Sequence, residues 1–287
     1  MSSGAPIASA SVASARVLEL IAAGGVFVLT GAGVSTESGI PDYRDEQGEW
    51  KQRPPIQFRE FTLSAARRQR YWARSVLGWA RMREARPNAA HHSLARFEAL
   101  GLVSALVTQN VDGLHQAAGA RNVVDLHGRI DQVVCLDCGR RSPREALQAR
   151  LAELNPGWLA RASQLAPDGD ADPGDADTRD FRVAPCAECD GVLKPDVVFF
   201  GEHVPPERVK RAFDALGDAR SLLVVGSSLM VFSGYRFARA AAQRGLDIAI
   251  VNRGRTRGDE LASAKVEASA GEFLPELERG LGDPTGA

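Results

Sequence analysis

The chain has almost no net charge and no long hydrophobic run. Its 35 Lys and Arg residues nearly balance 36 Asp and Glu residues, which leaves a formal net charge of −1. Because the basic residues are also scattered, the sequence offers no electrostatic footprint for a nucleic-acid backbone. No apolar run approaches the roughly 18 residues that a membrane-spanning helix needs. We therefore predict a protein that binds neither nucleic acid nor membrane.

The sequence is also short of cysteine, with four in 287 residues, which excludes a small disulfide-stapled scaffold. Residues 1–15 are rich in Ala and Ser but lack a basic start followed by an apolar stretch. This pattern does not indicate secretion, and we predict a cytoplasmic protein. The length predicts one large or two smaller domains, enough to bury a core and shape a cleft.

Short apolar or β-branched runs recur along the chain, several of them separated by helix-like stretches. The runs are residues 26–30, 103–108, 123–126, 197–200, 222–225 and 248–251, and the helix-like stretches include 206–216 and 235–244. This alternation predicts an α/β fold with a Rossmann-like parallel sheet covered by helices on both faces. Ligands of such sheets bind outside the carboxyl ends of the strands, so candidate site residues lie just after each run.

Two stretches interrupt the alternation. Residues 64–85 place Tyr71, Trp72 and Trp79 among arginines, which predicts an amphipathic helical insertion. Residues 135–194 hold every cysteine and an Asp/Gly/Pro-rich stretch at 167–180 that we expect to be a solvated loop. The predicted division is a large domain from 1–44, 91–134 and 195–287, a helical insertion at 45–90 and a small zinc-binding module at 135–194.

The four cysteines form two CxxC pairs, Cys135 with Cys138 and Cys186 with Cys189. Four thiolates match a structural zinc site, which has no open position for catalysis. The gap between the pairs exceeds the roughly 15 to 20 residues of a common zinc ribbon, so spacing supports the site less strongly than usual. Disulfides are disfavoured in the cytoplasm, and a redox CxxC would need only one pair. We predict one structural zinc ion.

The turn after the first run, Gly31-Ala32-Gly33-Val34-Ser35, is typical of a nucleotide-binding loop, where glycine lets the backbone approach a pyrophosphate. The third glycine of the dinucleotide fingerprint is replaced by Thr36. No second strand ending in an acid follows about 20 residues later, as hydride-transferring enzymes require. The pattern disfavours a dehydrogenase but remains compatible with a dinucleotide.

Polar side chains follow two further runs. Asn110 and Asp112 place an amide and a carboxylate at the expected ligand edge, although Asx residues there are often only caps or turn formers. His127 closes the next run and is a candidate general base, or alternatively a packed core histidine or a stray metal ligand. The other histidines, His91, His92, His115 and His203, lack such a position.

Taken together and in order, these motifs resemble those of the sirtuin family over about residues 17–280. The matching stretches are 31–44, 108–112, 126–128, the two CxxC pairs, 194–202, 225–229 and 251–252. Finer features at 135–139, 194–202 and 226–237 resemble the class II branch, to which the mitochondrial sirtuin 4 of animals belongs, and we expect a bacterial source.

The resemblance implies a lysine deacylase that consumes NAD and yields nicotinamide, free lysine and O-acyl-ADP-ribose. It implies that the acyl oxygen attacks the ribose carbon as nicotinamide leaves, and that His127 then removes a ribose hydroxyl proton. Asn110 would order the nicotinamide ribose and a water, and Asp112 would hold the carboxamide. Zinc would lie far away and be structural.

The resemblance also implies two sets of binding residues. The remaining NAD contacts would be Gly31, Ala32, Gly33, Ser35, Tyr43, Arg44, Gln109, Val111, Gly226, Ser227, Ser228, Asn252, Arg253, Gly254 and Ala270. Tyr43 stands where many relatives have Phe and would shield the ribose carbon. A substrate peptide would add as a strand along Val198, Phe199, Gly201 and Glu202.

The one signal for the acyl preference is the pair Tyr71 and Arg74, which are three residues apart and hence on one helix face. A Tyr-x-x-Arg pair resembles the one by which another sirtuin class grips acidic acyl chains, and a guanidinium suits a terminal carboxylate. We hypothesise that glutaryl or hydroxymethylglutaryl exceeds acetyl as a substrate. The alternative is that Arg74 is solvated and Tyr71 only packs.

Other functions remain open. The same site could transfer ADP-ribose to a protein or remove lipoyl or biotinyl groups, or the chain could be a non-catalytic zinc-ribbon module that binds NAD or acylated peptides. The expected partners are acylated lysine side chains of proteins. The sequence predicts no oligomeric state.

Overall fold

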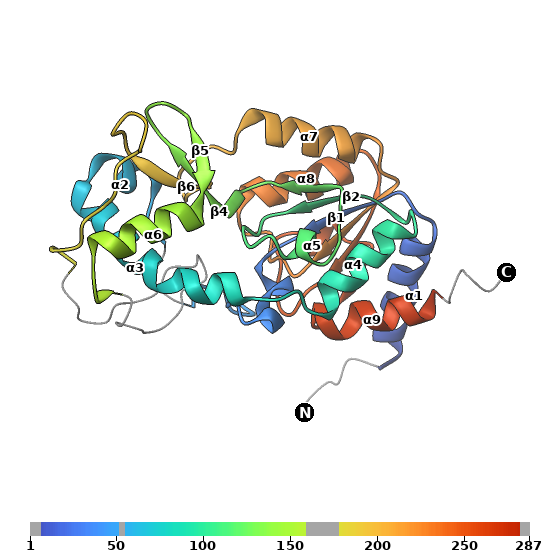
Figure 1. The fold of residues 1–287 in the computed structure, drawn as a ribbon. Coiled ribbons are helices and arrows are strands. Elements are labelled where there is room, and N and C mark those ends of the chain that lie inside the picture. Colours follow the sequence, from blue (N-terminus) through green and yellow to red (C-terminus); the bar gives the residue numbers. More distant parts are fainter. Residues whose placement is uncertain (1–6, 52–54, 159–177, 282–287) are drawn as a thin grey trace.

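The computed structural model describes residues 7–51, 55–158 and 178–281 (Figure 1). Most of the predicted solvated loop, residues 167–177, lies outside these ranges, and so do residues 1–6 of the N-terminal stretch. Within the described ranges, no helix is both long enough and apolar enough to span a bilayer.

The larger of the two described sheets is parallel throughout. Its strand order is β3-β2-β1-β7-β8-β9. The strands are β1 (Val26–Thr30), β2 (Val103–Thr108), β3 (Val123–Asp125), β7 (Ser221–Val225), β8 (Asp247–Val251) and β9 (Ala264–Val266). Five of the six predicted runs therefore form strands of this sheet, and the predicted fold class is confirmed. The short β9 carries no distinctive apolar run and was not predicted.

Helices cover both faces of this sheet. α1 (Ile7–Ala22), α4 (Ala89–Ala99) and α9 (Ala270–Gly280) lie on one face, and α7 (Pro206–Gly217) and α8 (Phe232–Gln243) on the other (Figure 1). Successive strand side chains point to opposite faces, so Val28 packs under the first group and Phe27 under the second. The helices predicted at 206–216 and 235–244 are confirmed as α7 and α8, the second starting three residues earlier.

A second group of described elements forms a smaller unit beside the large sheet (Figure 1). It contains the antiparallel sheet β5-β4-β6 and the helices that pack on it. These elements are β4 (Gly128–Cys135), β5 (Arg141–Pro143), β6 (Leu193–Val197), α2 (Phe58–Leu63), α3 (Ala65–Glu84) and α6 (Arg144–Leu154). The predicted helical insertion is confirmed as α3, whose first turn is capped by the Ser64 hydroxyl.

One predicted strand is wrong. Residues 197–200 are not a strand of the parallel sheet, because β6 ends at Val197 and pairs with β4 in the small antiparallel sheet. An apolar run has the same pattern whether it fills a parallel sheet or packs against another core, and Phe199 is buried in the core of the small unit. β4 and β6 pair with each other, and each contains one of the domain boundaries expected after residues 134 and 194. The predicted division into three parts therefore remains a proposal.

The order of the strands determines where a ligand site can form. From β1 the chain runs outward to β2 and β3, and it returns to the other side of β1 with β7. The carboxyl ends of β1 and β7 therefore lie at a topological switch point, where open α/β sheets form their ligand crevice. Two short 3-10 helices, η1 (Ala32–Val34) and η2 (Thr36–Ser38), and the short helix α5 (Leu114–Ala117) lie near this edge.

Candidate active site

A cavity of about 710 Å³ opens at this switch point and reaches into the small unit. Its volume is that of a site for a sizeable organic ligand. The lining residues come from the ends of β1, β2 and β7, from the segment 40–51, and from residues 197–204 at the edge of the small unit. Residues that follow the strands of the parallel sheet therefore line one continuous cavity, as the sequence predicts.

Glycines form the floor of the cavity. The Gly33 N–H donates to the Gly226 carbonyl at 2.8 Å, which joins the turn after β1 to the turn after β7. A Cβ atom on Gly31 would lie 2.7 Å from the Ser227 Cβ, and one on Gly33 would lie 2.9 Å from the Gly226 oxygen. Only glycine allows this approach, so part of the wall is bare backbone. A bare backbone wall is what a pyrophosphate needs.

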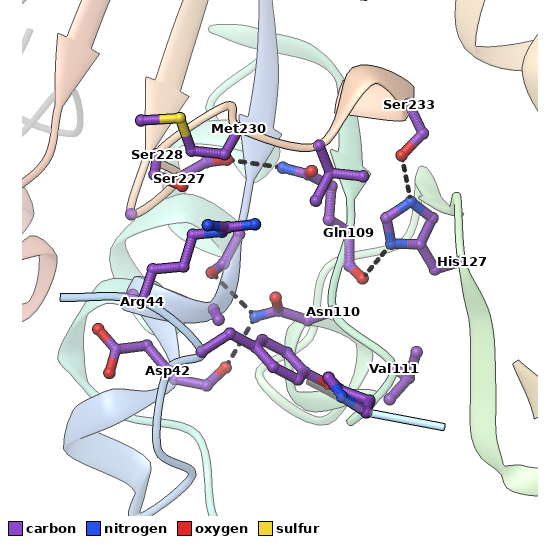
Figure 2. A pocket seen from close by; sticks show the side chains of 18 of the residues that line it. Asp42, Arg44, Gln109, Asn110, Val111, His127, Ser227, Ser228, Met230 and Ser233 are labelled. Carbon is purple, nitrogen blue, oxygen red and sulfur yellow. Dashed lines mark hydrogen bonds between the residues drawn. The ribbon is translucent and has the colours of Figure 1, made fainter. Parts of the chain in front are cut away.

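Asn110 and Asp112 lie beside this floor and both bond to Ser35; Figure 2 shows Asn110. Asn110 Nδ2 donates to the Gly31 carbonyl at 3.1 Å and to Ser35 Oγ at 3.0 Å. The Ser35 hydroxyl donates to Asp112 Oδ2 at 2.7 Å, and the Leu114 N–H donates to Asp112 Oδ1 at 2.9 Å. Burial raises the pKa of Asp112, against the lowering effect of these two hydrogen bonds. The pair is thus more than a turn former, since both side chains face the cavity.

Two histidines that lacked an assignable position in the sequence lie behind this group. His91 Nε2 is 3.5 Å from Ser35 Oγ, and its ring packs against that of His115 at a tilt of 54°, with the centroids 4.8 Å apart. His115 Nε2 is 2.9 Å from the Thr30 hydroxyl. Burial lowers the pKa of His91 to about 4 and that of His115 to about 3. Both rings are therefore neutral at pH 7.

These buried rings predict that acid destabilises the fold. In the unfolded chain a histidine gains a proton below its ordinary pKa of 6.5, whereas folded His115 resists protonation down to about 3. The free energy of unfolding therefore decreases as the pH is lowered below 6.5. His115 alone lowers it by about 2 kcal/mol between about pH 7.5 and about pH 5.

Urea unfolding at both pH values measures this loss. We expect His115→Gln to lose about 2 kcal/mol less than the parent protein over the same range. The control is His203→Gln, at an exposed histidine, which should leave the pH dependence unchanged. Equal pH dependence in the parent and the His115 variant would contradict the neutral buried ring.

His127 faces the cavity from the end of β3 (Figure 2). Its Nδ1 lies 2.9 Å from the Gln109 carbonyl and its Nε2 lies 2.7 Å from the Ser233 hydroxyl. Burial lowers the pKa of His127 to about 4, reinforced by Arg236 and Arg208 and opposed by the Gln109 hydrogen bond. Because a carbonyl only accepts hydrogen bonds, the neutral ring carries its proton on Nδ1. Its Nε2 then accepts a hydrogen bond from the Ser233 hydroxyl. This tautomer is the one that a base acting through Nε2 requires.

Most of the other predicted site residues also line the cavity. They are Ala32, Tyr43, Arg44, Gln109, Val111, Ser227, Ser228, Asn252, Arg253, Ala270, Val198, Phe199, Gly201, Glu202 and Tyr71. Gly254 and Arg74 are not among the described lining residues. Arg44 lies over the Trp50 ring at 4.1 Å and donates to the Gly48 carbonyl, which orders the segment 44–50 along the rim.

Residues 198–202 form an edge of the small unit that includes a turn, in which the Glu202 N–H donates to the Phe199 carbonyl at 3.0 Å. Glu202 accepts the Phe199 N–H at 2.8 Å and pairs with Lys194 at 3.0 Å. The Val198 N–H donates to the His127 carbonyl at 2.8 Å, which fixes this edge beside the candidate base. Burial lowers the pKa of Lys194, partly offset by Glu202.

The four cysteines come together at the far end of the small unit. Their sulfur atoms all lie within 4.8 Å of one another, and all four are free thiols. The Cys135–Cys189 and Cys138–Cys186 sulfur separations are 3.6 and 3.9 Å. Tetrahedral zinc with Zn–S bonds of about 2.3 Å needs sulfur atoms about 3.8 Å apart. The residues present therefore fit a structural zinc ion.

Comparison with known proteins identifies the family. The model of the Sir2 family matches residues 31–233, most of the chain. This chain belongs to the Sir2 family. A protein of Bordetella bronchiseptica named NAD-dependent protein deacetylase is 57% identical over 252 residues, which cover 88% of this chain and 92% of the relative. NAD-dependent protein deacetylase 1 of Streptomyces coelicolor is 53% identical over 279 residues, covering 97% of this chain and 93% of the relative.

Solved Sir2 structures share the fold. A complex described as Sir2 with a p53 peptide and NAD+ has a TM-score of 0.75 and 30% identity, and it covers 92% of this chain and 97% of the solved chain. One described as Sir2 bound to acetylated peptide has a TM-score of 0.74 and 27% identity, covering 93% and 98%.

Two residues at or behind the cavity of this Sir2 protein escaped prediction from the sequence. Ser233 reaches His127 from the first turn of α8, and His91 reaches Ser35 from α4. For His91 a local signal existed, because Asn88 caps α4 and the His91 side chain completes the capping box. That signal indicates a helix start and not a site, so proximity to Ser35 could come only from the tertiary fold.

Proposed function

We propose that this Sir2 protein is an NAD-dependent protein-lysine deacylase that yields nicotinamide, free lysine and O-acyl-ADP-ribose. The observation that carries the proposal is the convergence of Asn110, Asp112 and His127 on one cavity with a backbone floor. These side chains follow two different strands and gain a joint role only in the folded chain. Relatives named NAD-dependent protein deacetylase over nearly the whole chain support the same conclusion.

The residues present fit NAD. When bound, NAD supplies the leaving nicotinamide and the ribose carbon that takes the acyl oxygen. The bare backbone of residues 31–33 holds the pyrophosphate, and Asp112 accepts a hydrogen bond from the carboxamide. Asn110 uses its Nδ2 group on Gly31 and Ser35, and Figure 2 shows both of these bonds at the nitrogen and none at the side-chain oxygen. That oxygen orients the ribose or a water.

His127 acts as the general base. Its neutral ring keeps Nε2 as an acceptor, because Nδ1 donates to the Gln109 carbonyl. In the protein alone Nε2 accepts from Ser233, and in the reaction it accepts a ribose hydroxyl proton. The peptide lies along residues 198–202, where main-chain hydrogen bonds give affinity and the lysine side chain enters the cavity. A neighbour described as Sir2 bound to acetylated peptide supports an acylated peptide as the substrate.

The acyl chain meets a wall built by the helical insertion. Tyr71 and Met82 of α3 line the cavity together with Ile40 and Val111. Tyr71 packs edge to face on Phe61 at 5.3 Å and lies 5.3 Å from Phe199, so its position is fixed. Arg74, one turn along the same helix, is partly buried but is not among the lining residues. Preference for acidic or branched acyl chains, and membership of the class II branch, therefore stay predictions.

An acyl-peptide panel tests both levels of the proposal. With NAD and lysine peptides carrying acetyl, glutaryl, hydroxymethylglutaryl or lipoyl groups, we expect nicotinamide, free lysine and O-acyl-ADP-ribose by mass spectrometry. If Arg74 binds the acid, Arg74→Ala lowers turnover of the glutaryl peptide relative to acetyl on the order of ten-fold, as loss of a charged hydrogen bond predicts. Arg70→Ala, an exposed arginine on α3, is the matched control.

The outcomes of the panel are distinct. An acetyl preference that Arg74→Ala leaves unchanged would remove the acidic hypothesis and leave deacylation standing. A product with ADP-ribose attached to protein would replace deacylation by ADP-ribosyl transfer. Binding of NAD or peptide without nicotinamide release would favour a non-catalytic module. The predicted cytoplasmic location stays a prediction that fractionation of the source cells would test.

A further inference from the structure

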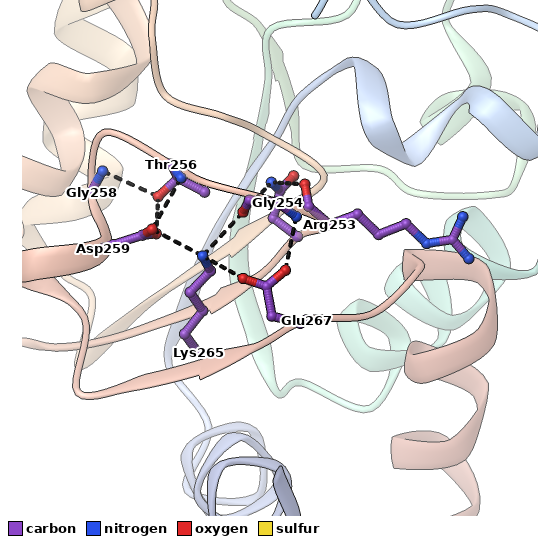
Figure 3. A network of polar contacts seen from close by, with 8 residues as sticks. Arg253, Gly254, Thr256, Gly258, Asp259, Lys265 and Glu267 are labelled. Atoms are coloured by element: carbon purple, nitrogen blue, oxygen red, sulfur yellow. Dashed lines mark hydrogen bonds and ion pairs between the residues drawn. The ribbon is translucent and has the colours of Figure 1, made fainter. Parts of the chain in front are cut away.

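A polar network lies behind the loop that follows β8, with Lys265 of β9 at its centre (Figure 3). Lys265 Nζ donates to the Gly254 carbonyl at 3.0 Å and to Asp259 Oδ2 at 2.9 Å, and it pairs with Glu267 Oε1 at 2.6 Å. The Lys265 side chain is only 22% exposed, so water screens these contacts incompletely. One cation thus joins two carboxylates to the main chain of the loop.

The network holds Gly254 from both sides. Its N–H donates to Glu267 Oε2 at 2.8 Å, while its carbonyl accepts from Lys265. Gly254 has a φ of +77°, and a Cβ there would collide with the Glu46 carbonyl. A non-glycine residue would meet both strain and a clash. The peptide is therefore fixed in one conformation by the carboxylate on one side and the ammonium on the other.

A second arm of the network orders the far end of the loop. The Thr256 N–H and hydroxyl both donate to the Asp259 carboxylate, and the Gly258 N–H donates to the Thr256 hydroxyl oxygen. Burial lowers the pKa of Lys265, but hydrogen bonds to Glu267 and Asp259 outweigh it, and the pKa is raised. Lys265 is charged at neutral pH and bridges the two arms.

The ordered loop presents two residues to the cavity. Asn252 and Arg253 line it, whereas Lys265 is not among the described lining residues. Asn252 Nδ2 donates to the Arg253 carbonyl at 2.7 Å, and the Arg255 N–H donates to the Glu46 carbonyl at 2.8 Å. Figure 3 shows the Arg253 side chain extending away from the network. The loop is thereby fastened to the rim segment that contains Glu46, which also lines the cavity.

We propose that Lys265 is a positioning residue for dinucleotide binding, which holds residues 252–256 in the conformation that receives the adenosine half of NAD. The inference rests on the proposed function, because it needs NAD in this cavity with its adenosine at this loop. Lys265 touches no reacting group, so its loss reduces the population of the binding-competent loop and leaves the chemical step intact. If that population falls to about a tenth, the apparent affinity for NAD falls about ten-fold.

The test compares Lys265→Met with Lys265→Arg, which retains charge and donors, and with Lys210→Met. Lys210 pairs with Asp214 on the exposed face of α7 and is the matched control. We expect Lys265→Met to weaken NAD binding in calorimetry and raise the KM for NAD about ten-fold, with kcat and the KM for peptide unchanged. Lys265→Arg should recover most of the affinity. Amide hydrogen exchange over 252–258 should quicken in the methionine variant without NAD.

Two results would overturn the inference. One is unchanged NAD affinity in Lys265→Met. The other is a fall in kcat and thermal midpoint with the KM for NAD unchanged, which indicates a purely structural role. If Lys265→Met does not fold, Glu267→Ala takes its place, because this variant releases the Gly254 N–H. The same measurements are made on it and the same results are expected. Asn252→Ala separates the two proposals: unchanged NAD affinity there contradicts the adenosine assignment itself, whereas weaker binding there with normal binding in Lys265→Met contradicts only this inference.

Discussion

Replacing His127 by alanine lowers the rate of lysine deacylation by about 10² to 10⁴ fold, the usual contribution of a general base. The variant loses the imidazole whose Nδ1 is bound to the Gln109 carbonyl and whose Nε2 accepts a proton in the cavity. The fold and the NAD affinity stay largely intact, because the backbone floor and the Ser35 group lie elsewhere in the cavity. Steady-state turnover, calorimetry with NAD and thermal unfolding measure the three quantities.

The control for this variant is His203→Ala, since His203 also lines the cavity but is exposed. Near-normal turnover in His127→Ala would refute the assignment. The pH profile gives a second readout: because the pKa of His127 is lowered to about 4, its neutral form persists on acidification. Any decline of kcat/KM caused by His127 begins only below about pH 5 and deepens as pH falls.

Removing one zinc ligand abolishes activity as well, because it unfolds the small unit. Cys186→Ser leaves three thiolates, and the purified protein then holds well under one zinc ion per chain. Structural zinc in small domains carries an apparent binding free energy of about 10–16 kcal/mol, which becomes folding free energy. The small unit therefore unfolds, and with it the segment 198–202 and the activity. Metal analysis and circular dichroism measure these losses.

A matched control lies beside the cluster. Arg140→Ala breaks an exposed ion pair with Glu188 and removes no ligand, so zinc content and activity should persist. A strong chelator should reproduce the effect of Cys186→Ser on the parent protein. Full activity in a metal-free chain, or a thermal midpoint that the chelator leaves unmoved, would contradict a structural ion.

The sequence was sufficient where a local pattern has one physical meaning. The apolar run 26–30 is β-branched, short and closed by glycines, a combination that favours a buried strand ending where backbone approaches backbone. The two CxxC pairs use every cysteine of the chain, which favours one shared metal site. The run at 197–200 was misassigned because burial in either core produces the same composition.

Contacts between distant elements could not be read from the chain. Arg144 is completely buried between the rings of Trp72 and Trp79, at 5.3 and 5.1 Å, and nothing in its neighbourhood along the chain announces a buried cation. His91 and His115 meet only because the first turns of α4 and α5 pack against each other. The partners of such residues are set by tertiary packing, which the neighbouring sequence does not determine.

His127 lies at the junction between the two sheets. Residue 128 begins β4 of the small sheet, and the His127 carbonyl accepts the Val198 N–H at the start of the proposed peptide edge. The main chain of His127 is thus bonded to the peptide edge, while its imidazole is held by the Gln109 carbonyl and the Ser233 hydroxyl of the large unit. A substrate that displaced this edge would therefore strain the two hydrogen bonds that aim the base, so one residue couples the fit of the peptide to proton transfer.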